Sequence, residues 1–257
     1  MGVIELSYIE VALGYIFVLV VLWFLKRRQI NRQKELILAS IRMTVQLVLV
    51  GFILTWIFEN PHPLITLAII LAMNSFAVFT IFKKFKKTLN PRLKKVIAIS
   101  IPLGTLPVIA FFLWIVIKVN PYYNPQYFIP ISGMIIGNSM TGISLGVQTL
   151  VNRFTHNKDE VLTLLYFGAT PKEASYQIVN DGFDAAIMPT LNSMLGMGII
   201  FLPGMMTGQI LSGTLPTTAI LYQIMIMLGI LGGVSLTTYG FLTFGYRTFF
   251  NQQQQLR

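Results

Sequence analysis

The feature that most constrains this chain is a succession of long apolar runs with few charged residues inside them. The runs cover about residues 8–25, 36–58, 64–82, 96–117, 129–151, 185–202 and 217–244. An α-helix of about 20 apolar residues crosses the hydrocarbon layer of a membrane and satisfies its own backbone groups there. Only 11% of the residues are charged, less than half the share usual in soluble domains, which is roughly 25%. The sequence therefore predicts an all-α integral membrane protein, a bundle of seven transmembrane helices forming one domain over residues 1–257.

The charges that do occur predict the orientation of these helices. The net charge is +10, and the basic residues concentrate between the first and second runs and between the third and fourth. Residues 59–63 and 119–128 contain no lysine or arginine. This alternation follows the rule that basic loops stay in the cytoplasm, so we expect the amino terminus outside, the carboxyl terminus inside, and a multi-pass protein of the cell membrane (plasma or inner). The basicity is explained by topology, and no nucleic-acid partner is expected.

Glu5 and Glu10 precede the first run, whereas a cleaved signal peptide begins with basic residues, so this helix is expected to be retained.

The inner segment 152–180 is the most informative soluble-looking stretch between two runs and predicts two short helices. Acidic residues open the first helix at Lys158–Phe167, and Gly168 is a typical helix stop. Thr170, Pro171 and Glu173 match a capping box that starts the second helix. We expect the first helix to expose its apolar side chains, which are Val161, Leu164, Leu165 and Phe167. Such a surface fits either a groove on a partner protein or the bilayer surface.

Polar residues inside the apolar runs are few, and each is a candidate for the translocation pathway. Gln46, Asn74, Asn138 and Asn192 either line a pathway or hydrogen-bond neighbouring helices. Asp181 and Asp184 lie three residues apart at the inner end of the sixth run, where carboxylates could load a cation or pair with basic residues.

The loop between the sixth and seventh runs is a candidate outer turn or gate. Its residues are Pro203, Gly204, Met205, Met206, Thr207, Gly208 and Gln209, and we expect them to interrupt the helix. Thioethers bind soft metals but also fill apolar interfaces, so the two methionines do not identify a metal, and the metal ligands stay unknown.

Three glycine pairs spaced by four, Gly133–Gly137, Gly142–Gly146 and Gly229–Gly233, allow close helix packing within one chain or across a dimer. The polar tail Asn251–Gln255 is expected to be disordered.

Several kinds of catalytic chemistry do not fit this sequence. The chain has no cysteine and no phosphate-binding G-x-x-x-x-G-K-[ST] motif. Gly142–Gly146 has the G-x-S-x-G pattern, but it lies in an apolar run, and the two histidines, His62 and His156, fall on opposite sides of the membrane. We therefore expect no enzyme and no cofactor bound by this chain, and any ATP must be bound by another polypeptide.

Three stretches together resemble one membrane-protein family. They are Ile129–Met140, Glu160–Ala174 and Leu202–Gly213, the last with the sequence Pro-Gly-Met-Met-Thr-Gly-Gln-Ile. The chain is similar over nearly its whole length to the permeases of FetB-type iron-export ABC transporters, which are related to the plant aluminium-sensitivity permeases. The inner helix differs, because Tyr166 and Phe167 stand where that family usually has smaller residues.

The resemblance implies a permease subunit that exports iron or another metal, working as a homodimer with a separate cytoplasmic ABC ATPase that uses ATP–Mg. The residues it implies for ATPase coupling are Glu160, Leu164, Leu165, Gly168, Ala169, Thr170, Pro171 and Glu173. Two alternatives remain: an ABC permease for an organic solute such as a nucleotide sugar, or a non-transporting transmitter coupled to an ATPase.

Overall fold

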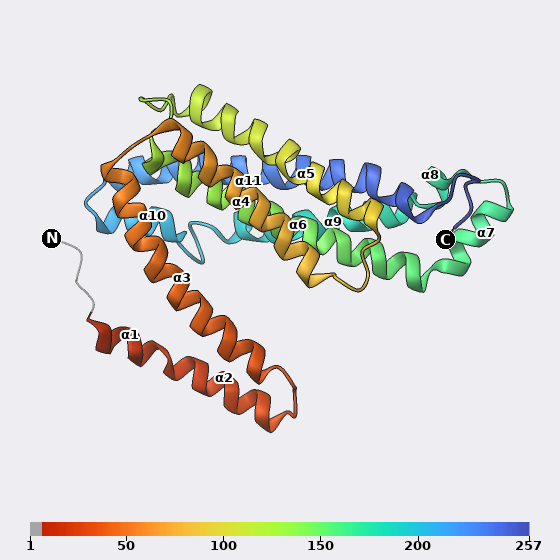
Figure 1. Cartoon of the computed structure of the whole chain (residues 1–257), viewed down its shortest axis with the longest axis horizontal. Helices are drawn as coiled ribbons and strands as arrows, with labels where there is room; N and C mark the ends of the chain where they lie inside the picture. The colour runs from red at the N-terminus through yellow and green to blue at the C-terminus, as the bar shows by residue number, and fades with distance from the viewer. Residues whose placement is uncertain (1–6, 257) are drawn as a thin grey trace. The chain divides into compact units, whose positions relative to one another are not determined.

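The computed structural model describes residues 7–256, and for Tyr8 the backbone alone. Within that range the regular elements are helices (Figure 1), which confirms the all-α prediction. The chain divides into two compact units. Unit 1 holds the residues up to Pro61 together with Leu211–Gly213, and unit 2 holds His62–Ile210 and the chain from Thr214 onward.

Unit 1 consists of α1 (Tyr8–Gly14), α2 (Ile16–Arg27) and α3 (Gln33–Glu59). The hydroxyl of Tyr15, between α1 and α2, shares a hydrogen bond with the hydroxyl of Thr44 on α3. Lys26 and Arg27 end α2, where cations interact favourably with the negative end of the helix dipole. The first two predicted runs are thus helices, and each is long and apolar enough to span a membrane.

Unit 2 contains the remaining helices and the candidate functional residues other than Gln46. In chain order they are α4 (Pro63–Lys84), α5 (Pro91–Ala110) with the π-helical turn η1 (Phe111–Val116), α6 (Pro125–His156), α7 (Lys158–Tyr166), α8 (Pro171–Ala174), α9 (Tyr176–Gly196), α10 (Gly204–Leu211) and α11 (Pro216–Gly245) with the 3-10 turn η2 (Tyr246–Phe249). The first residue of α4, α5 and α6 is proline, which suits that position because its missing N–H has no helical partner there. The preceding residue caps each helix through its side chain.

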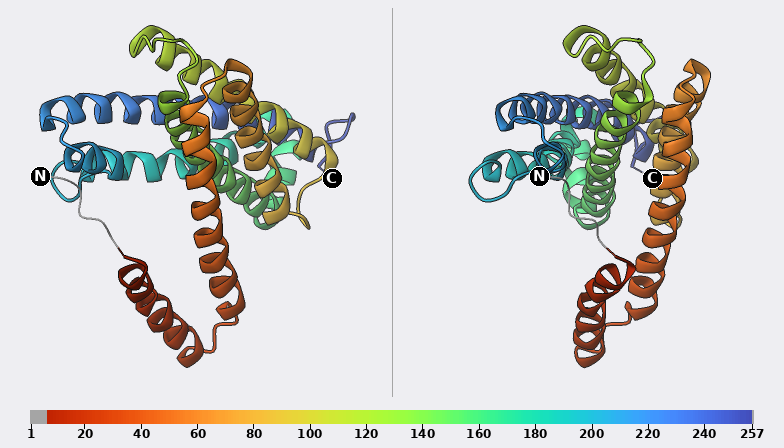
Figure 2. Two further views of the ribbon diagram at one scale, coloured as in Figure 1. Left: turned by 60° about the vertical axis from the view of Figure 1, so that its left-hand side comes forward. Right: turned by 90° about the vertical axis from the view of Figure 1, so that its left-hand side faces the viewer.

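The core of unit 2 forms where α11 packs against α5, α6 and α9, while α6 also packs against α4. Figure 2 shows α11, in blue, running beside α9, in cyan. Completely buried residues in this core include Ile97, Ile135, Ile143, Leu150 and Phe241, with 0% exposure. The closest approach is between α5 and α11, where a Cβ on Gly104 would lie 2.6 Å from the Cα of Thr237. Only glycine fits at that position without a backbone shift.

The predicted span 185–202 differs from the helix that forms there. Helix α9 starts nine residues earlier, at Tyr176, and ends at Gly196. Residues 197–203 are not a regular helix, and Gly198 has a φ of +82°. The predicted span therefore included both the end of α9 and part of the loop that follows it. Hydropathy does not separate the two, because the loop residues Ile199, Ile200, Phe201 and Leu202 are apolar but not helical. Among residues 7–256, six helices are long and apolar enough to span a membrane, and α9 is not one of them.

The carboxyl-terminal tail is ordered, contrary to the sequence expectation. Gln255 N donates to Asn251 Oδ1 at 2.9 Å, and Asn251 Nδ2 donates to Gln255 Oε1 at 2.9 Å. The Phe154 ring on α6 stacks on Phe249, with centroids 4.3 Å apart, and meets Phe250 edge-on at 5.9 Å. Aromatic packing therefore fixes this polar segment at the end of α6.

Candidate functional site

An elbow formed by α7, residues 167–170 and α8 lies at one end of unit 2. Gly168, with a φ of +88°, closes the turn, and its N–H donates to Leu165 O at 3.0 Å. Ala169 N donates to Leu164 O at the same distance. A left-handed backbone of this kind is strained for residues with a Cβ. The glycine stop predicted from the sequence is confirmed.

The second helix of the elbow starts with the expected capping box. Thr170 N donates to Glu173 Oε2 at 2.8 Å, and Glu173 N donates to Thr170 Oγ1 at 3.3 Å. The backbone N–H of Thr170, followed by its hydroxyl, lowers the pKa of Glu173 below its ordinary value of 4.5. The carboxylate is exposed, so it stays hydrated, and the hydrogen bonds from Thr170 further stabilise its charged form.

The elbow exposes a different apolar set from the one expected. Tyr166 and Phe167 are each 86% exposed, and Leu164 is 39% exposed. Val161 was expected on the surface, but it is 1% exposed in the core, and Leu165 packs against that core. The helix turns these two residues toward the core, so the exposed knob consists of Leu164, Tyr166 and Phe167. Glu160 is also exposed and accepts a hydrogen bond from Asn157 Nδ2 at 2.8 Å.

The carboxyl terminus lies at the same end of unit 2 as the elbow (Figure 1). A hollow of about 460 Å³ separates α7 from the tail. Its lining is Leu162, Leu165, Tyr166 and Ala169 on the elbow, and Gln253, Gln254, Gln255 and Leu256 on the tail. The elbow therefore stands beside the tail.

A second candidate site is a polar stripe along α6. Between Ile131 and Val151 the exposed residues of this helix are Asn138, Thr141 and Gln148, all of them polar. Their spacing of three, seven and ten residues places them on one face of an α-helix. Asn138 Nδ2 donates to Met134 O at 2.8 Å, so its Oδ1 is the atom available to a ligand. Thr141 and Gln148 were not singled out in the sequence, although the helical spacing from Asn138 is visible there.

A matching stripe runs along α9. Exposed residues at helical spacing on this helix are Gln177, Asp184, Met188, Asn192 and Leu195, so its polar side chains alternate with two apolar ones. Half-buried Asp181 lies on the same face and forms an ion pair with Arg153 of α6, with Nη2 2.8 Å from Oδ2. Gln177 Nε2 also donates to Asp181 Oδ1, at 3.1 Å. Because Arg153 follows the α6 stripe by about one turn, this pair joins the two stripes at the ends nearer the elbow. We call the joined stripes the α6–α9 polar face.

The register between α6 and α9 sets the depth of each polar residue. A Cβ on Gly142 would lie 3.4 Å from Ala186 O, and a Cβ on Gly146 would lie 3.6 Å from Gly182 O. The helices therefore run antiparallel, and one further turn brings Asn138 to about the level of Asn192. Asp181 and Asp184 lie near the end that carries the elbow. The glycine pair Gly142–Gly146 thus serves packing within one chain.

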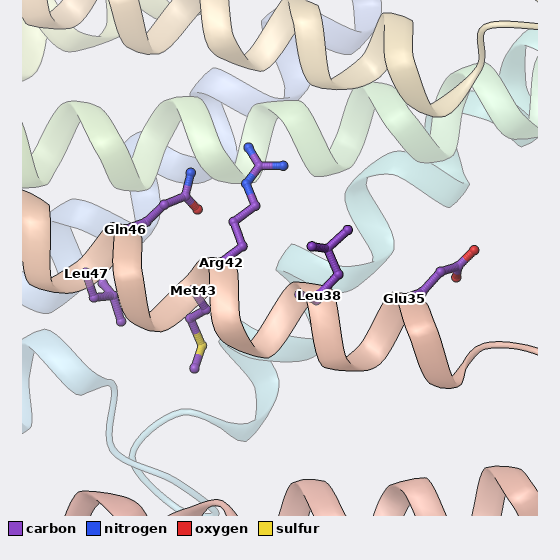
Figure 3. A pocket seen from close by; sticks show the side chains of 7 residues that line it. Glu35, Leu38, Arg42, Met43, Gln46 and Leu47 are labelled. Atoms are coloured by element: carbon purple, nitrogen blue, oxygen red, sulfur yellow. The ribbon is translucent and has the colours of Figure 1, made fainter.

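The other two candidate pathway residues have different surroundings. Asn74 on α4 is 4% exposed, its Nδ2 donates to Ile70 O at 3.0 Å, and its Oδ1 accepts from Thr105 Oγ1 of α5 at 2.9 Å. Asn74 therefore joins two helices inside the core. Gln46 belongs to unit 1 and is exposed beside a hollow of about 440 Å³ along α3. Its side chain and that of Arg42 extend from the same side of α3 (Figure 3).

The outer turn is more helical than expected. Residues from Gly204 to Gln209 belong to α10, so the break in the helix precedes them, at residues 197–203. Met206 is 7% exposed, and Met205 packs against the core. Met206, Met197 and Gln223 share a pocket of about 310 Å³ with Gly198, Leu202, Ile220 and Ile224. Thr207 Oγ1 donates to Pro203 O at 3.0 Å, which holds the first turn of α10.

No group of three or more histidine, cysteine, aspartate or glutamate side chains suited to a metal ion occurs among the described residues. The α6–α9 polar face offers amide and hydroxyl oxygens with carboxylates at one end. Such a surface suits weak, successive contacts with a passing cation better than tight storage of one.

Comparison with known proteins identifies relatives over the whole chain. Residues 8–250 match the model of the family described as "Uncharacterised protein family (UPF0014)". The chain is 32% identical to the "UPF0014 membrane protein YjkA" of Bacillus subtilis (strain 168), over 98% of this chain and 99% of that protein. No solved structure matches the chain.

Two further relatives have names that mention a process. The chain is 32% identical to the "Probable iron export permease protein FetB" of Escherichia coli (strain K12), over 96% of this chain and 93% of that protein. It is also 32% identical to the "Protein ALUMINUM SENSITIVE 3" of Arabidopsis thaliana, over 90% of this chain and 82% of that protein.

Proposed function

Because this chain belongs to the UPF0014 family of multi-pass membrane proteins, we propose that it is the permease subunit of an ABC transporter and that it exports iron or another metal ion. ATP is hydrolysed by a separate cytoplasmic subunit, and this chain itself catalyses no reaction. The similarity to the FetB permease of E. coli supports metal export. The elbow of α7 and α8 supports the link to an ATPase, and it is the observation that carries the proposal.

A bundle of seven membrane-spanning helices fits this function, with α9 as the sixth span. Helix α9 has 21 residues, which gives about 31 Å at 1.5 Å per residue, enough for the hydrocarbon layer. It runs antiparallel between α6 and α11, so lipid does not surround it and its polar residues are tolerable. The stacked Phe154 and Phe249 bring the ends of α6 and α11 together. The carboxyl terminus and the elbow would then both be cytoplasmic, as the basic loops require.

The ATPase binds the exposed knob of Leu164, Tyr166 and Phe167. Two aromatic side chains that are 86% exposed at a helix end form an apolar projection suited to a groove. The capping box and Gly168 fix the direction of the chain on both sides of this projection. The elbow therefore moves as one body with α6 and α9, which is what force transmission from an ATPase requires.

Co-purification of the ATPase with tagged permease tests this coupling. Phe167→Asp and Leu164→Asp place a charge in the knob and should abolish recovery of the ATPase, because a charge buried without a partner is costly. Thr155→Asp is the matched control, since Thr155 is exposed on the last turns of α6 outside the knob. Full recovery of the ATPase with both knob variants refutes docking at the elbow.

Stimulation of ATP hydrolysis in the reconstituted permease–ATPase pair tests the substrate. We expect Fe²⁺, Mn²⁺ or Zn²⁺ to raise the rate of ATP hydrolysis, since the polar face carries oxygen ligands for cations. A nucleotide sugar is the comparison solute, and its phosphates would require basic side chains along the path. If the nucleotide sugar raises the rate and none of the three metals does, the permease moves an organic solute. If no solute changes the rate, a transmitter without transport is favoured.

A further inference from the structure

We infer that the turn between α4 and α5 binds the headgroup of an anionic phospholipid, whose acyl chains lie along the exposed apolar sides of these two helices. The site consists of residues 83–95, which we call the basic hairpin. The binding requires neither a transported solute nor an ATPase, so it goes beyond the proposed transport function.

The basic hairpin carries a high density of positive charge. Seven of its residues are basic, namely Lys83, Lys84, Lys86, Lys87, Arg92, Lys94 and Lys95. No aspartate or glutamate occurs in residues 60–158, and within the described residues 7–256 none of the seven forms an ion pair. All seven are exposed except Lys94, which is half-buried. A basic cluster directly beside a membrane span attracts anionic lipid headgroups.

Three of these charges lie at a helix end that disfavours them. Lys83 and Lys84 end α4, where the helix dipole favours cations. Arg92, Lys94 and Lys95, in contrast, lie at the positive amino end of α5, whose first turn contains no acidic residue. An anion at this place is attracted by the helix end and by the side chains together. The orientation rule for basic loops requires positive charge in the loop, but it does not require it at this end of a helix.

The basic hairpin is held in one shape against the core. Leu93 is completely buried, with 0% exposure, and its N–H donates to Asn90 Oδ1 at 2.7 Å. Asn90 Nδ2 in turn donates to Thr248 O of η2 at 3.4 Å. Lys94 Nζ lies 6.0 Å from the centroid of the Phe82 ring, which brings a charge of α5 beside α4. A headgroup therefore meets a preformed surface, and its binding does not have to order the loop.

On both helices the basic residues continue a stripe of exposed apolar side chains. Phe79 on α4 is 60% exposed, and Lys83 follows it by four residues, which places both on one face of the helix. On α5, Lys95, Ile99 and Leu103 repeat at the same spacing, and the two apolar residues are 57% and 67% exposed. Apolar surface with a cation one turn further along is complementary to a phospholipid, which joins acyl chains to a charged head.

A lipid explains this surface better than an acidic protein or a nucleic acid. Those partners would match the charges alone. The stripes at Phe79, Ile99 and Leu103 are covered by acyl chains in a membrane, since each of these helices is long and apolar enough to span one. The headgroups of the same lipids then lie at the level of Lys83 and Lys95, so charge and apolar surface are satisfied by one molecule.

Native mass spectrometry of the whole chain, released from a neutral detergent, tests the ligand by counting the lipids that stay bound. The probes are phosphatidylglycerol and phosphatidylcholine with identical acyl chains, and inorganic phosphate as a competitor. We expect phosphatidylglycerol to bind at least about tenfold more tightly than phosphatidylcholine, because each lysine near a headgroup favours the anionic one. Equal binding of the two lipids overturns the anionic site. Displacement of phosphatidylglycerol by an equal concentration of phosphate overturns a lipid as the ligand.

A charge-matched pair of variants tests the location. Lys83→Gln combined with Lys95→Gln removes one charge from each stripe and should lower the preference for phosphatidylglycerol several-fold, while the other basic residues of the hairpin keep the orientation of the chain. Lys158→Gln combined with Lys172→Gln is the control, since it removes the same charge from exposed side chains of the elbow. An unchanged lipid preference in the hairpin variant overturns the site.

A second set of variants tests the acyl chains. Phe79→Asn and Ile99→Asn should each weaken binding of phosphatidylglycerol, because they place an amide where the chains lie. Leu228→Asn on α11 is the control, since Leu228 is 50% exposed on a helix outside the hairpin. Equal binding by both stripe variants and the control overturns the acyl contact.

Recovery of the ATPase distinguishes a lipid from a protein partner. The variant with Lys83→Gln and Lys95→Gln should lose its preference for phosphatidylglycerol and still recover the ATPase. If that variant keeps its lipid preference and loses the ATPase, the basic hairpin contacts protein and the lipid assignment is overturned. Docking at the elbow is tested separately by its own variants, so either result leaves it intact.

Discussion

Arg153 on α6 and Asp181 on α9 form an ion pair, with Nη2 2.8 Å from Oδ2, and the pair joins the two helices at the end of the α6–α9 polar face nearer the elbow. Both oxygens of Asp181 are engaged, one by Arg153 and one by Gln177. Asp184, one turn further on, is exposed. The two carboxylates that looked equivalent in the sequence therefore differ in their availability to a cation.

This difference predicts unequal effects on transport. If the proposed metal export uses the α6–α9 polar face, Asp184→Asn should lower export several-fold in reconstituted vesicles, because it removes the exposed carboxylate of that face. Asp181→Asn should affect export less, and its cost to stability should stay within about 1 kcal/mol, since the ion pair is partly exposed to solvent. Equal export by wild type and Asp184→Asn would show that Asp184 does not load the substrate.

The contact between Gly104 and Thr237 predicts a strong effect of a single methyl group. Gly104→Ala should destabilise the bundle by at least about 1–3 kcal/mol, the usual cost of overpacking, because the collision is with backbone atoms of α11. The measurement is thermal unfolding in detergent. Gly240→Ala is the matched control at the same helix pair, because its new Cβ would meet Ser100 Oγ at an ordinary 3.8 Å. A melting temperature of Gly104→Ala equal to that of the control would contradict the packing.

The aromatic cluster at the end of α6 predicts that the tail depends on one ring. Phe154→Ala should cost about 3–5 kcal/mol, as for other buried phenylalanines, because it removes the stack on Phe249 and the edge contact with Phe250. The tail should then become sensitive to protease. Phe244→Ala should leave the tail protected, since Phe244 is 55% exposed. Protease resistance of the tail in the Phe154 variant would mean that other contacts hold it.

The capping box of the elbow predicts a pH dependence at α8. The folded-state pKa of Glu173 lies below its ordinary value of 4.5. Its contribution to the cap is therefore complete above pH 4.5 and is lost as the pH falls through the lowered pKa. The chemical shift of the Thr170 amide, which donates to Glu173, should change in that window. Glu173→Gln should remove the change, and an identical titration in that variant would assign it to another group.

The sequence predicted the features that depend on neighbouring residues. The membrane class, the limits of most helices, the stop at Gly168 and the cap of Thr170 and Glu173 all follow from local composition and spacing. The error at residues 185–202 has the same origin. Hydropathy counted Ile199 and Ile200 as helix, although the chain had already turned at Gly198, and it passed over the polar first half of α9.

Which side of a helix faces a partner was decided by tertiary structure. Asn74 and Asn138 are the same residue type in two apolar runs, but Asn74 bonds to α5 inside the core and Asn138 lies on the polar face. Val161 and Phe167 both looked exposed, and only Phe167 is. The sequence alone determined that the chain enters a membrane as helices, because burial of apolar surface and backbone hydrogen bonding are satisfied helix by helix. The direction of each polar group was set only when α6, α9 and α11 packed together, because packing between distant segments decides which face of a helix loses its solvent.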